Sequence, residues 1–315
     1  MRGITIFSGS AHQALAEEIC QQLDTPLSPA MLMRFSNDCL QTQLQANCRE
    51  EDVFIIQPLV PPVQENTMEL LLMLDAARGA SAARITAVIP HYSYARSDKK
   101  DAPRISIGGR LVADLIQTAG ANRVLTMALH SPQVHGFFSV PTDHLNALNV
   151  IADHFRSTDI SNAVVVSPDL GNAKQATNFA GLLGLPVAAG SKRRMADDKV
   201  KVDMIVGDVA GKDAIVLDDE IATGGSMIEI VEKIKEQGGR RISVACTHGL
   251  FSGSAIERFR DCELIDEIVT TNTVPLAPEK MLPNMTVLSI APLLANAIHN
   301  IHCGESVSQL FVHGV

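Results

Sequence analysis

The most constraining feature of the sequence is a regular alternation of short β-branched runs with longer segments of helical period. In 11–23, for example, Leu15, Ile19 and Leu23 fall on one face of an expected helix that follows an apolar run at 4–7. The alternation predicts an α/β fold with mainly parallel sheets flanked by helices, because parallel strands need long crossover connections. Further strands are expected at 53–57, 85–89, 123–129, 163–166, 214–217, 242–246 and 287–290, and further helices at 65–78, 107–119, 172–183, 225–237, 254–259 and 293–301.

The length of 315 residues suits two domains, since single domains typically span about 100–200 residues. The boundary is expected near 143–148, which gives a first domain over 1–146 and a second over 147–299. The C-terminal tail, about 300–315, is long enough to pack back on the first domain. We find no short repeat of fixed period.

The composition narrows the class of protein. Apolar residues make up 46% and aromatic residues 4%, with no Trp, so aliphatic side chains must build the cores, as in parallel sheets covered on both faces. The net charge of -9 argues against binding to nucleic acid or to an anionic membrane, although a few basic residues can still converge on a phosphorylated ligand. No segment has the roughly 20 apolar residues of a membrane span or the apolar core of a signal peptide. The six cysteines form no C-x-x-C pair and are expected to be free thiols, so we expect a soluble cytoplasmic protein.

The segment 214–227, AIVLDDEIATGGSM, carries the sharpest chemical signal. An apolar strand ends in Asp218 and Asp219, and the loop Thr223–Ser226 then opens a helix. Loop amides and a helix N-terminus can bind a phosphate, glycines allow close approach of the backbone, and the two carboxylates can accept hydrogen bonds from sugar hydroxyls, directly or through a metal. The alternative is an acidic turn before a capped helix.

This segment resembles the PRPP-binding loop that phosphoribosyltransferases and PRPP synthetases share. Other segments choose between the two groups, and in order along the chain they resemble the ribose-phosphate pyrophosphokinase (PRPP synthetase) family. These segments are PHYSYARSDKK at 90–100, LHSPQVHGFF at 129–138, VVSPDLGN at 165–172, KRR at 192–194 and SVSQLF at 306–311.

The resemblance implies two phosphoribosyltransferase-like domains, an N-terminal one that binds nucleotide and a C-terminal one that binds ribose phosphate. It also implies transfer of the β,γ-pyrophosphoryl group of Mg-ATP to the C1 hydroxyl of ribose 5-phosphate, which gives PRPP and AMP. The implied residues are Lys192 and Arg194 for catalysis; Phe35, Asn37, Cys39, Arg96, Ser97, Asp98 and His130 for nucleotide; Asp169, Asp218, Asp219, Ala222, Thr223, Gly224, Gly225 and Ser226 for ribose phosphate; and His130 and Asp169 for Mg²⁺.

Without the resemblance, several of these residues have simpler interpretations. His130 would be a half-buried imidazole, Asp169 a turn residue after Pro168, and the segment 191–199, SKRRMADDK, a solvated charged loop. His135 matches no ligand of the family, and we expect it to be structural.

The chain also departs from the family pattern, which makes it a divergent member. The nucleotide loop commonly contains R-F-S-D-G-E, whereas 34–39 is RFSNDC, so Asn37 and Cys39 replace two carboxylates. Ala222 replaces a carboxylate before T-G-G, and Leu170 stands where His or a small residue is common. Because of Asn37 and Cys39, the donor base is expected to be selected less strictly.

Two other functions fit part of this pattern. A phosphoribosyltransferase would consume PRPP, but the 129–138 and 192–194 segments and the chain length argue against it. A regulatory paralogue with weak turnover would explain Asn37, Cys39 and Ala222.

The family resemblance also implies dimers that assemble further, most simply into a hexamer, with Phe35 completing the adenine pocket of a neighbouring subunit.

Overall fold

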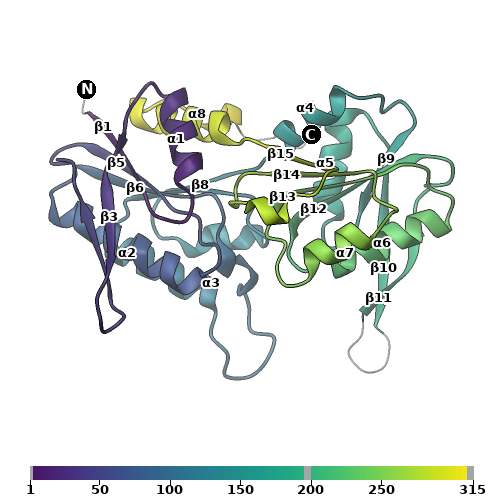
Figure 1. Ribbon diagram of the computed structural model, residues 1–315, viewed down its shortest axis with the longest axis horizontal. Helices are drawn as coiled ribbons and strands as arrows, with labels where there is room; N and C mark the ends of the chain where they lie inside the picture. Colours follow the sequence, from purple (N-terminus) through teal and green to yellow (C-terminus); the bar gives the residue numbers. More distant parts are fainter. Residues whose placement is uncertain (1–2, 195–199, 311–315) are drawn as a thin grey trace. The chain divides into compact units, whose positions relative to one another are not determined.

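The computed structural model describes residues 3–194 and 200–310, and it describes side chains outside 192–203. Within these residues the chain forms two compact units. Unit 1 contains 3–146, 273–275 and 290–310, and unit 2 contains 147–272 and 276–289. Each unit is built around its own sheet, and each is described by itself below (Figure 1).

Unit 1 contains a six-stranded parallel sheet with the order β2-β1-β5-β6-β7-β8. Its middle strand β5 is buried at every residue, because helices cover both faces of the sheet. The strands are β1 (Ile4–Ser8), β2 (Leu27–Ser28), β5 (Asp52–Ile56), β6 (Arg84–Ile89), β7 (Arg123–Met127) and β8 (Thr142–Leu145).

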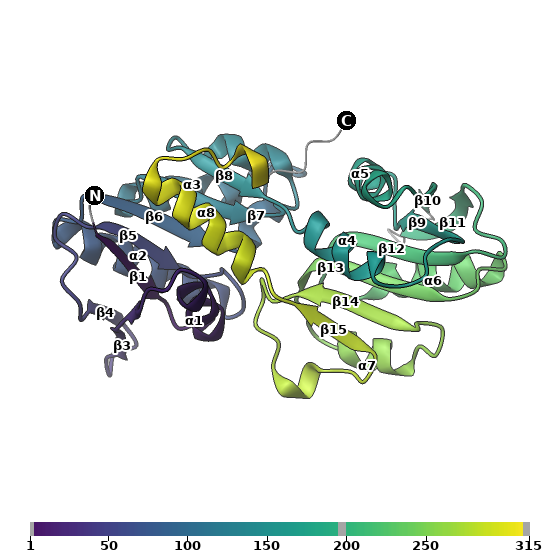
Figure 2. The ribbon, with the colours of Figure 1, turned by 90° about the horizontal axis from the view of Figure 1, so that it is seen from above.

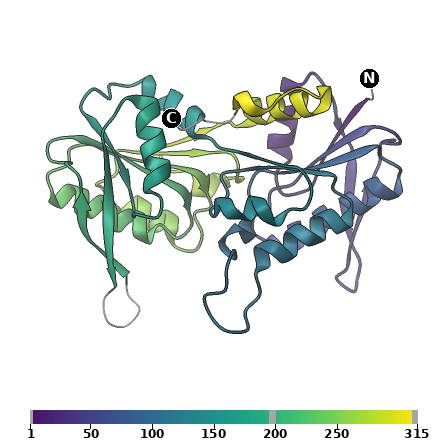
Figure 3. The ribbon, with the colours of Figure 1, turned by 180° about the vertical axis from the view of Figure 1, so that it is seen from behind.

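Two pairs of helices cover this sheet. Helices α1 (Gln13–Gln22) and α8 (Ala291–Cys303) lie on one face, and α2 (Val63–Gly79) and α3 (Gly108–Ala119) lie on the other (Figure 3). Short 3-10 helices follow β6, β7 and α8, namely η1 (Ser93–Arg96), η2 (Pro132–Phe137) and η4 (Ser308–Leu310).

Polar contacts fix the last helix, α8, to unit 1. The buried Asp52 pairs with Arg84, whose guanidinium also donates to the carbonyl of Ile301 at 2.8 Å. Nδ1 of His302 lies 2.9 Å from Oδ2 of the same Asp52. The second domain was expected to extend to residue 299, but these contacts and the packing of α8 on the sheet place 290–310 in unit 1.

A separate two-stranded antiparallel hairpin, β3 (Ala30–Arg34) and β4 (Leu40–Leu44), also belongs to unit 1. It projects away from the six-stranded sheet (Figure 2).

Unit 2 contains a seven-stranded sheet with the order β11-β10-β9-β12-β13-β14-β15. Only the edge strand β11 runs antiparallel to its neighbour. Helices α4 (Leu148–Arg156) and α5 (Ala173–Leu183) lie on one face, and α6 (Gly225–Glu236) and α7 (Ala255–Asp261) on the other (Figure 1). The strands are β9 (Ala163–Ser167), β10 (Val187–Arg194), β11 (Val200–Val206), β12 (Asp213–Ile221), β13 (Ile242–Gly249), β14 (Glu267–Thr271) and β15 (Met285–Leu288), and η3 (Pro278–Lys280) precedes β15.

This architecture confirms the α/β prediction of mainly parallel sheets flanked by helices. Among the described residues, no helix is both long and apolar enough to cross a membrane.

Candidate active site

The polar residues of unit 2 gather where the order of strands in the sheet reverses. From β9 the chain moves to β10 on one side of the sheet, and it then returns to β12 on the other side of β9. The loops that follow β9 and β12 therefore diverge, and ligands of open α/β sheets bind in the crevice that such diverging loops leave. Asp169 lies just after β9, next to Pro168, and Asp218 and Asp219 lie in the second half of β12.

One asparagine joins these carboxylates. The backbone N–H of Asn172 donates to Oδ1 of Asp169 at 3.1 Å, and its side-chain Nδ2 donates to Oδ1 of Asp218 at 3.1 Å. The structure thus brings together Asp169 and Asp218, which are predicted site residues 49 positions apart in number. Sequence reasoning missed Asn172, because an Asn at the start of an expected helix is an ordinary capping residue.

The carboxylates are close enough to affect each other's ionisation. Burial raises the pKa of Asp218 well above its usual range, and the neighbouring charges of Asp219 and Asp169 raise it further. Asp219 is itself buried, with 8% of its surface exposed. Such a group of carboxylates favours a bound cation or hydroxyl donors over bulk water.

The Thr223–Ser226 loop follows β12 and leads into α6. Gly224 has φ +75°, and a methyl group added there would lie 2.7 Å from Cε2 of Phe259, so both the conformation and the space require glycine. No side chain among the described residues caps α6, which leaves its first amides pointing toward the loop. This arrangement can bind an anion through backbone N–H groups and the helix dipole.

Arg258 of α7 supports the same loop. Its guanidinium NH1 donates to the carbonyl of Thr223 at 3.0 Å, and NH1 lies 3.4 Å from a Cβ placed on Gly225. Sequence reasoning missed this residue, because α7 lies far along the chain and carries no motif that points to the loop.

In unit 1, predicted nucleotide residues occupy the loops after β6 and β7. Oγ of Ser131 donates to Oδ2 of Asp98 at 2.6 Å, so the loop with Arg96, Ser97 and Asp98 meets the loop with His130. The Ser97 hydroxyl accepts a 2.8 Å hydrogen bond from the N–H of Gly108. Arg96 and His130 are exposed at this end of the sheet.

Phe35, Asn37 and Cys39 occupy the tip of the β3–β4 hairpin rather than either loop. The Phe35 ring is 49% exposed, and Asn37 and Cys39 are exposed beside it. Oδ1 of Asn37 accepts a 3.2 Å hydrogen bond from the N–H of Cys39, so it stabilises the turn itself. Arg34 pairs with Asp38 within the hairpin and with Glu65 of α2.

Lys192 and Arg194 lie in β10, where their backbones pair with those of Val202 and Val200 of β11. A strand rather than a loop therefore carries them at this point of the chain. The positions of their side chains lie outside the described residues.

Other features of the described residues do not overlap with the predicted site. No group of three or more His, Cys, Asp or Glu side chains among them could hold a metal ion by itself.

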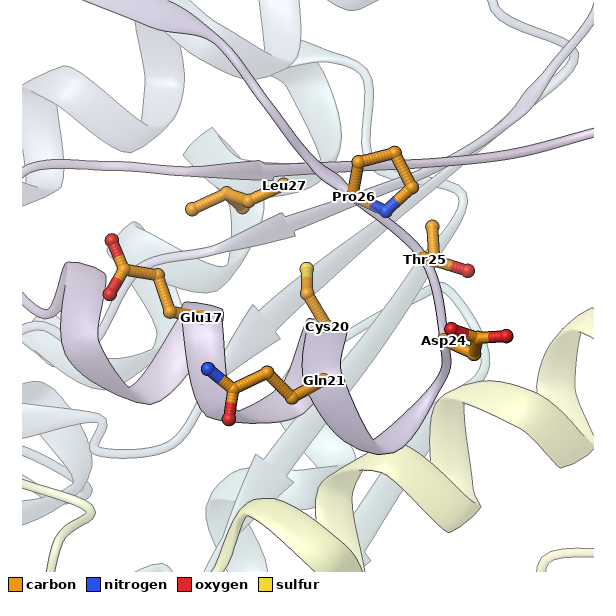
Figure 4. Close-up of a pocket in the computed structure, with 7 residues that line it drawn as sticks. All are labelled: Glu17, Cys20, Gln21, Asp24, Thr25, Pro26 and Leu27. Carbon is orange, nitrogen blue, oxygen red and sulfur yellow. The ribbon is translucent and has the colours of Figure 1, made fainter.

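A pocket of about 520 Å³ lies on unit 1, and none of its lining residues is a predicted site residue. Cys20 points from α1 toward the segment with Pro26 and Leu27 (Figure 4), and burial, aided by the charge of Glu17, raises its pKa to about 11. The pocket is acidic and holds an unreactive thiol, which suits neither a polyanion nor nucleophilic chemistry.

Comparison with known proteins agrees with the predicted resemblance. Residues 4–120 match the N-terminal domain of ribose phosphate pyrophosphokinase, and 194–312 match the phosphoribosyl synthetase-associated domain. A protein of Streptomyces coelicolor, provisionally named a ribose-phosphate pyrophosphokinase, is 63% identical over 99% of this chain and 98% of its own length. A ribose-phosphate pyrophosphokinase of Deinococcus radiodurans is 49% identical over 98% of both chains.

A solved structure gives the same result. The crystal structure of phosphoribosylpyrophosphate synthetase from Mycobacterium smegmatis matches with a TM-score of 0.91 and 38% identity, over 96% of this chain and all of that one. Both halves of the chain, and its whole length, are therefore accounted for by one group of enzymes. The chain belongs to the ribose-phosphate pyrophosphokinase family.

Proposed function

We propose that this chain transfers the β,γ-pyrophosphoryl group of ATP to the C1 hydroxyl of ribose 5-phosphate. The C1 oxygen bonds to the β-phosphorus, the bond between that phosphorus and the bridging oxygen to the α-phosphate breaks, and AMP leaves with PRPP as the second product. The hydroxyl proton passes to solvent or to the leaving phosphate. The observation that carries this proposal is the crevice of unit 2, where a glycine-rich anion loop and three carboxylates meet in a chain of this family.

Ribose 5-phosphate is assigned to that crevice. The Thr223–Ser226 amides and the start of α6 bind the 5-phosphate, and Ala222 forms the entrance of the loop. Asp218 and Asp219 accept hydrogen bonds from the ribose hydroxyls. Asp169 lies beside them and serves both the sugar and the metal.

ATP is assigned to residues of unit 1. Arg96 binds phosphate oxygens or stacks on the base, as a planar guanidinium can, and Ser97, Asp98 and His130 surround it. Phe35 supplies an aromatic face for adenine, with Asn37 and Cys39 next to it.

Mg²⁺ fits the chemistry of the carboxylate group in unit 2. The crowded carboxylates favour a hard cation, and since no complete protein cage exists among the described residues, phosphate oxygens must supply further ligands. Asp169 is the proposed protein ligand in unit 2, and His130 is the proposed one in unit 1. When bound, the ion neutralises phosphate charge, while Lys192 and Arg194 stabilise the charge that develops on the transferred and leaving phosphates.

Assembly is part of the proposal. An aromatic ring that is half exposed on a polar hairpin is expected to have a partner. We assign Phe35 to the adenine site of a neighbouring subunit, in a hexamer built from dimers. Light scattering of wild type and Phe35→Ala tests the assembly, and a fully active monomer would contradict it.

The substrates of the enzyme are charged metabolites that membranes retain, so we also place the enzyme in the cytoplasm.

One assay tests the reaction. The purified chain is incubated with ribose 5-phosphate, Mg²⁺ and ATP, and PRPP and AMP are measured, with GTP and CTP as alternative donors. We expect both products in equal amounts, and a Lys192→Ala variant with a much lower kcat but similar substrate affinity. Binding of nucleotide without turnover would instead indicate a regulatory paralogue, and consumption of PRPP with a free base would indicate a phosphoribosyltransferase.

A further inference from the structure

Asn172 occupies the N-cap position of α5, but its side chain makes no capping hydrogen bond. An Asn at this position normally accepts a hydrogen bond from an amide of the first helical turn, which stabilises the helix. Here the side chain turns toward β12, where Nδ2 lies 3.1 Å from Oδ1 of Asp218 and 3.4 Å from the carbonyl of Leu217. The local stabilisation of a cap is absent, and a contact to the neighbouring strand is present instead.

That contact fixes one oxygen of Asp218. Oδ1 accepts a hydrogen bond from Asn172 Nδ2 and a second one, at 2.9 Å, from the backbone N–H of Asp219. Two donors on the same oxygen set the plane of the carboxyl group. Both of these hydrogen bonds go to Oδ1, so together they fix the direction in which Oδ2 points. The side chain of Asp219 also interacts with this carboxyl group.

The same residue also sets the loop of Asp169. Its backbone N–H donates to Oδ1 of Asp169 at 3.1 Å, and Ser167 Oγ donates to the backbone carbonyl of Asp169 at 2.6 Å. Asn172 therefore holds both carboxyl groups, that of Asp169 with its backbone and that of Asp218 with its side chain. Its amide is neutral, so it orders a crowded group of carboxylates without adding charge to it.

We propose that Asn172 is a positioning residue for ribose 5-phosphate: it orients Asp218 so that Oδ2 meets a ribose hydroxyl. This inference rests on the proposed function of the crevice. Asn172 does not touch the substrate in this role, and it acts through Asp218.

Substitution by Ser separates positioning from helix capping. Ser is as good an N-cap as Asn, but its hydroxyl is too short to bridge to β12. Asn172→Ser is therefore expected to keep the thermal midpoint, while Asp218 loses its side-chain donor. Asn172→Asp, also a good N-cap, replaces the donor by a further negative charge. Asn178→Ser makes the same change further along α5, away from the crevice, and is the matched control.

The test measures KM for ribose 5-phosphate, KM for ATP, kcat and the thermal midpoint, together with ribose 5-phosphate binding by calorimetry in Mg²⁺. Loss of one hydrogen bond to a charged group predicts a rise of roughly tenfold in KM and Kd for ribose 5-phosphate in Asn172→Ser. Asn172→Asp should show a larger rise, KM for ATP should change less than about twofold in both variants, and Asn178→Ser should match wild type.

Two results would overturn the inference: an unchanged ribose 5-phosphate affinity in Asn172→Ser, or equal losses for both substrates with a lowered thermal midpoint. A wild-type chain that neither binds ribose 5-phosphate nor forms PRPP would remove the proposed function and this inference with it. If the wild type is active and Asn172→Ser binds ribose 5-phosphate equally well, only this inference is overturned.

Discussion

Each of the two sheets has a place where the strand order reverses, and the two places are filled differently. In unit 1 the chain goes from β1 to β2 on one side and later to β5 on the other. The loop after β1 is occupied there by a protein carboxylate: buried Glu69 accepts hydrogen bonds from Ser10 N at 2.9 Å, Ser10 Oγ at 2.6 Å and Gln57 Nε2 at 2.7 Å. The N–H of Ala11 in the same loop also has a protein acceptor, Gln57 Oε1, at 3.1 Å. These donors therefore need no acceptor from a ligand.

In unit 2 the corresponding place is built differently. No side chain in the described part of the chain caps α6, and Asn172 donates to Asp169 with its backbone N–H and to Asp218 with its side chain. Equal topology therefore does not give equal function. One reversal point is filled by its own buried Glu, whereas the other is the site that we propose for a ligand.

The largest effect is expected from Asp218→Asn. Loss of the carboxylate charge should lower kcat/KM for ribose 5-phosphate on the order of 100- to 1,000-fold. The thermal midpoint should rise or stay level, because the raised pKa of Asp218 reflects burial and repulsion that the neutral amide removes. Steady-state kinetics and calorimetry measure both. Asp213→Asn, at the start of the same strand, is the control, and similar kinetics in the two variants would contradict a role of Asp218 in binding ribose 5-phosphate.

The filled reversal point should show the opposite pattern. Glu69→Ala leaves buried donors of Ser10 and Gln57 without their acceptor and should lower the free energy of unfolding by about 3 kcal/mol. Glu69→Gln keeps one acceptor and should cost less. Denaturant titration measures the loss, and activity per folded molecule should stay within about twofold. An active-site defect without a stability defect would show that unit 1 also binds ligand there.

A smaller effect is expected from Gly224→Ala in the anion loop. The positive φ costs about 1 kcal/mol, and the added methyl group meets Phe259, so stability should fall by about 2 kcal/mol and KM for ribose 5-phosphate should rise. Gly211→Ala isolates the conformational cost, because Gly211 has φ +69° and open space around it. Equal losses of stability in the two variants would show that the loop adjusts without strain.

The smallest effect concerns His144 of unit 1. Burial, with a contribution from the charge of His135, lowers its pKa to about 4, and Nε2 accepts the N–H of Leu129 at 2.8 Å. The unfolded chain binds a proton below about pH 6.5 and the folded chain does not, so stability falls as pH falls from 6.5 toward 4. Between pH 7.5 and 5.5 the loss should be about 1 kcal/mol. His144→Gln should remove that part of the pH dependence, whereas His135→Gln should keep most of it.

Sequence patterns predicted the strand–helix alternation well, because buried parallel strands are short apolar runs bounded by polar loops. They set the end of β12 too early: 214–217 was expected, whereas β12 extends to Ile221 and pairs it with Gly249. Polar residues of a functional strand lack the apolar pattern although their backbones still pair. The β3–β4 hairpin was missed for a related reason, since neither strand is fully buried and the turn at Asp38 carries no glycine.

The candidate site was predictable only as far as its residues carry a motif. Asp169 and Thr223–Ser226 follow strands and Asp218 lies in the second half of β12, so their positions in unit 2 follow from the topology, and their roles stay predictions. The contacts of Asn172 and Arg258 depend on side-chain direction and on packing between elements far apart in sequence. No pattern along the chain encodes these contacts.

The attachment of α8 to unit 1 has a consequence for synthesis of the protein. Unit 2 lies within the sequence of unit 1, so the ribosome completes 147–289 before it makes the helix that covers one face of the first sheet. Until then Asp52 and Arg84 lack His302 and the carbonyl of Ile301, and the apolar face under α8 stays open to solvent. The first unit, although its synthesis begins first, can therefore complete its fold only after all residues of the second unit have been made.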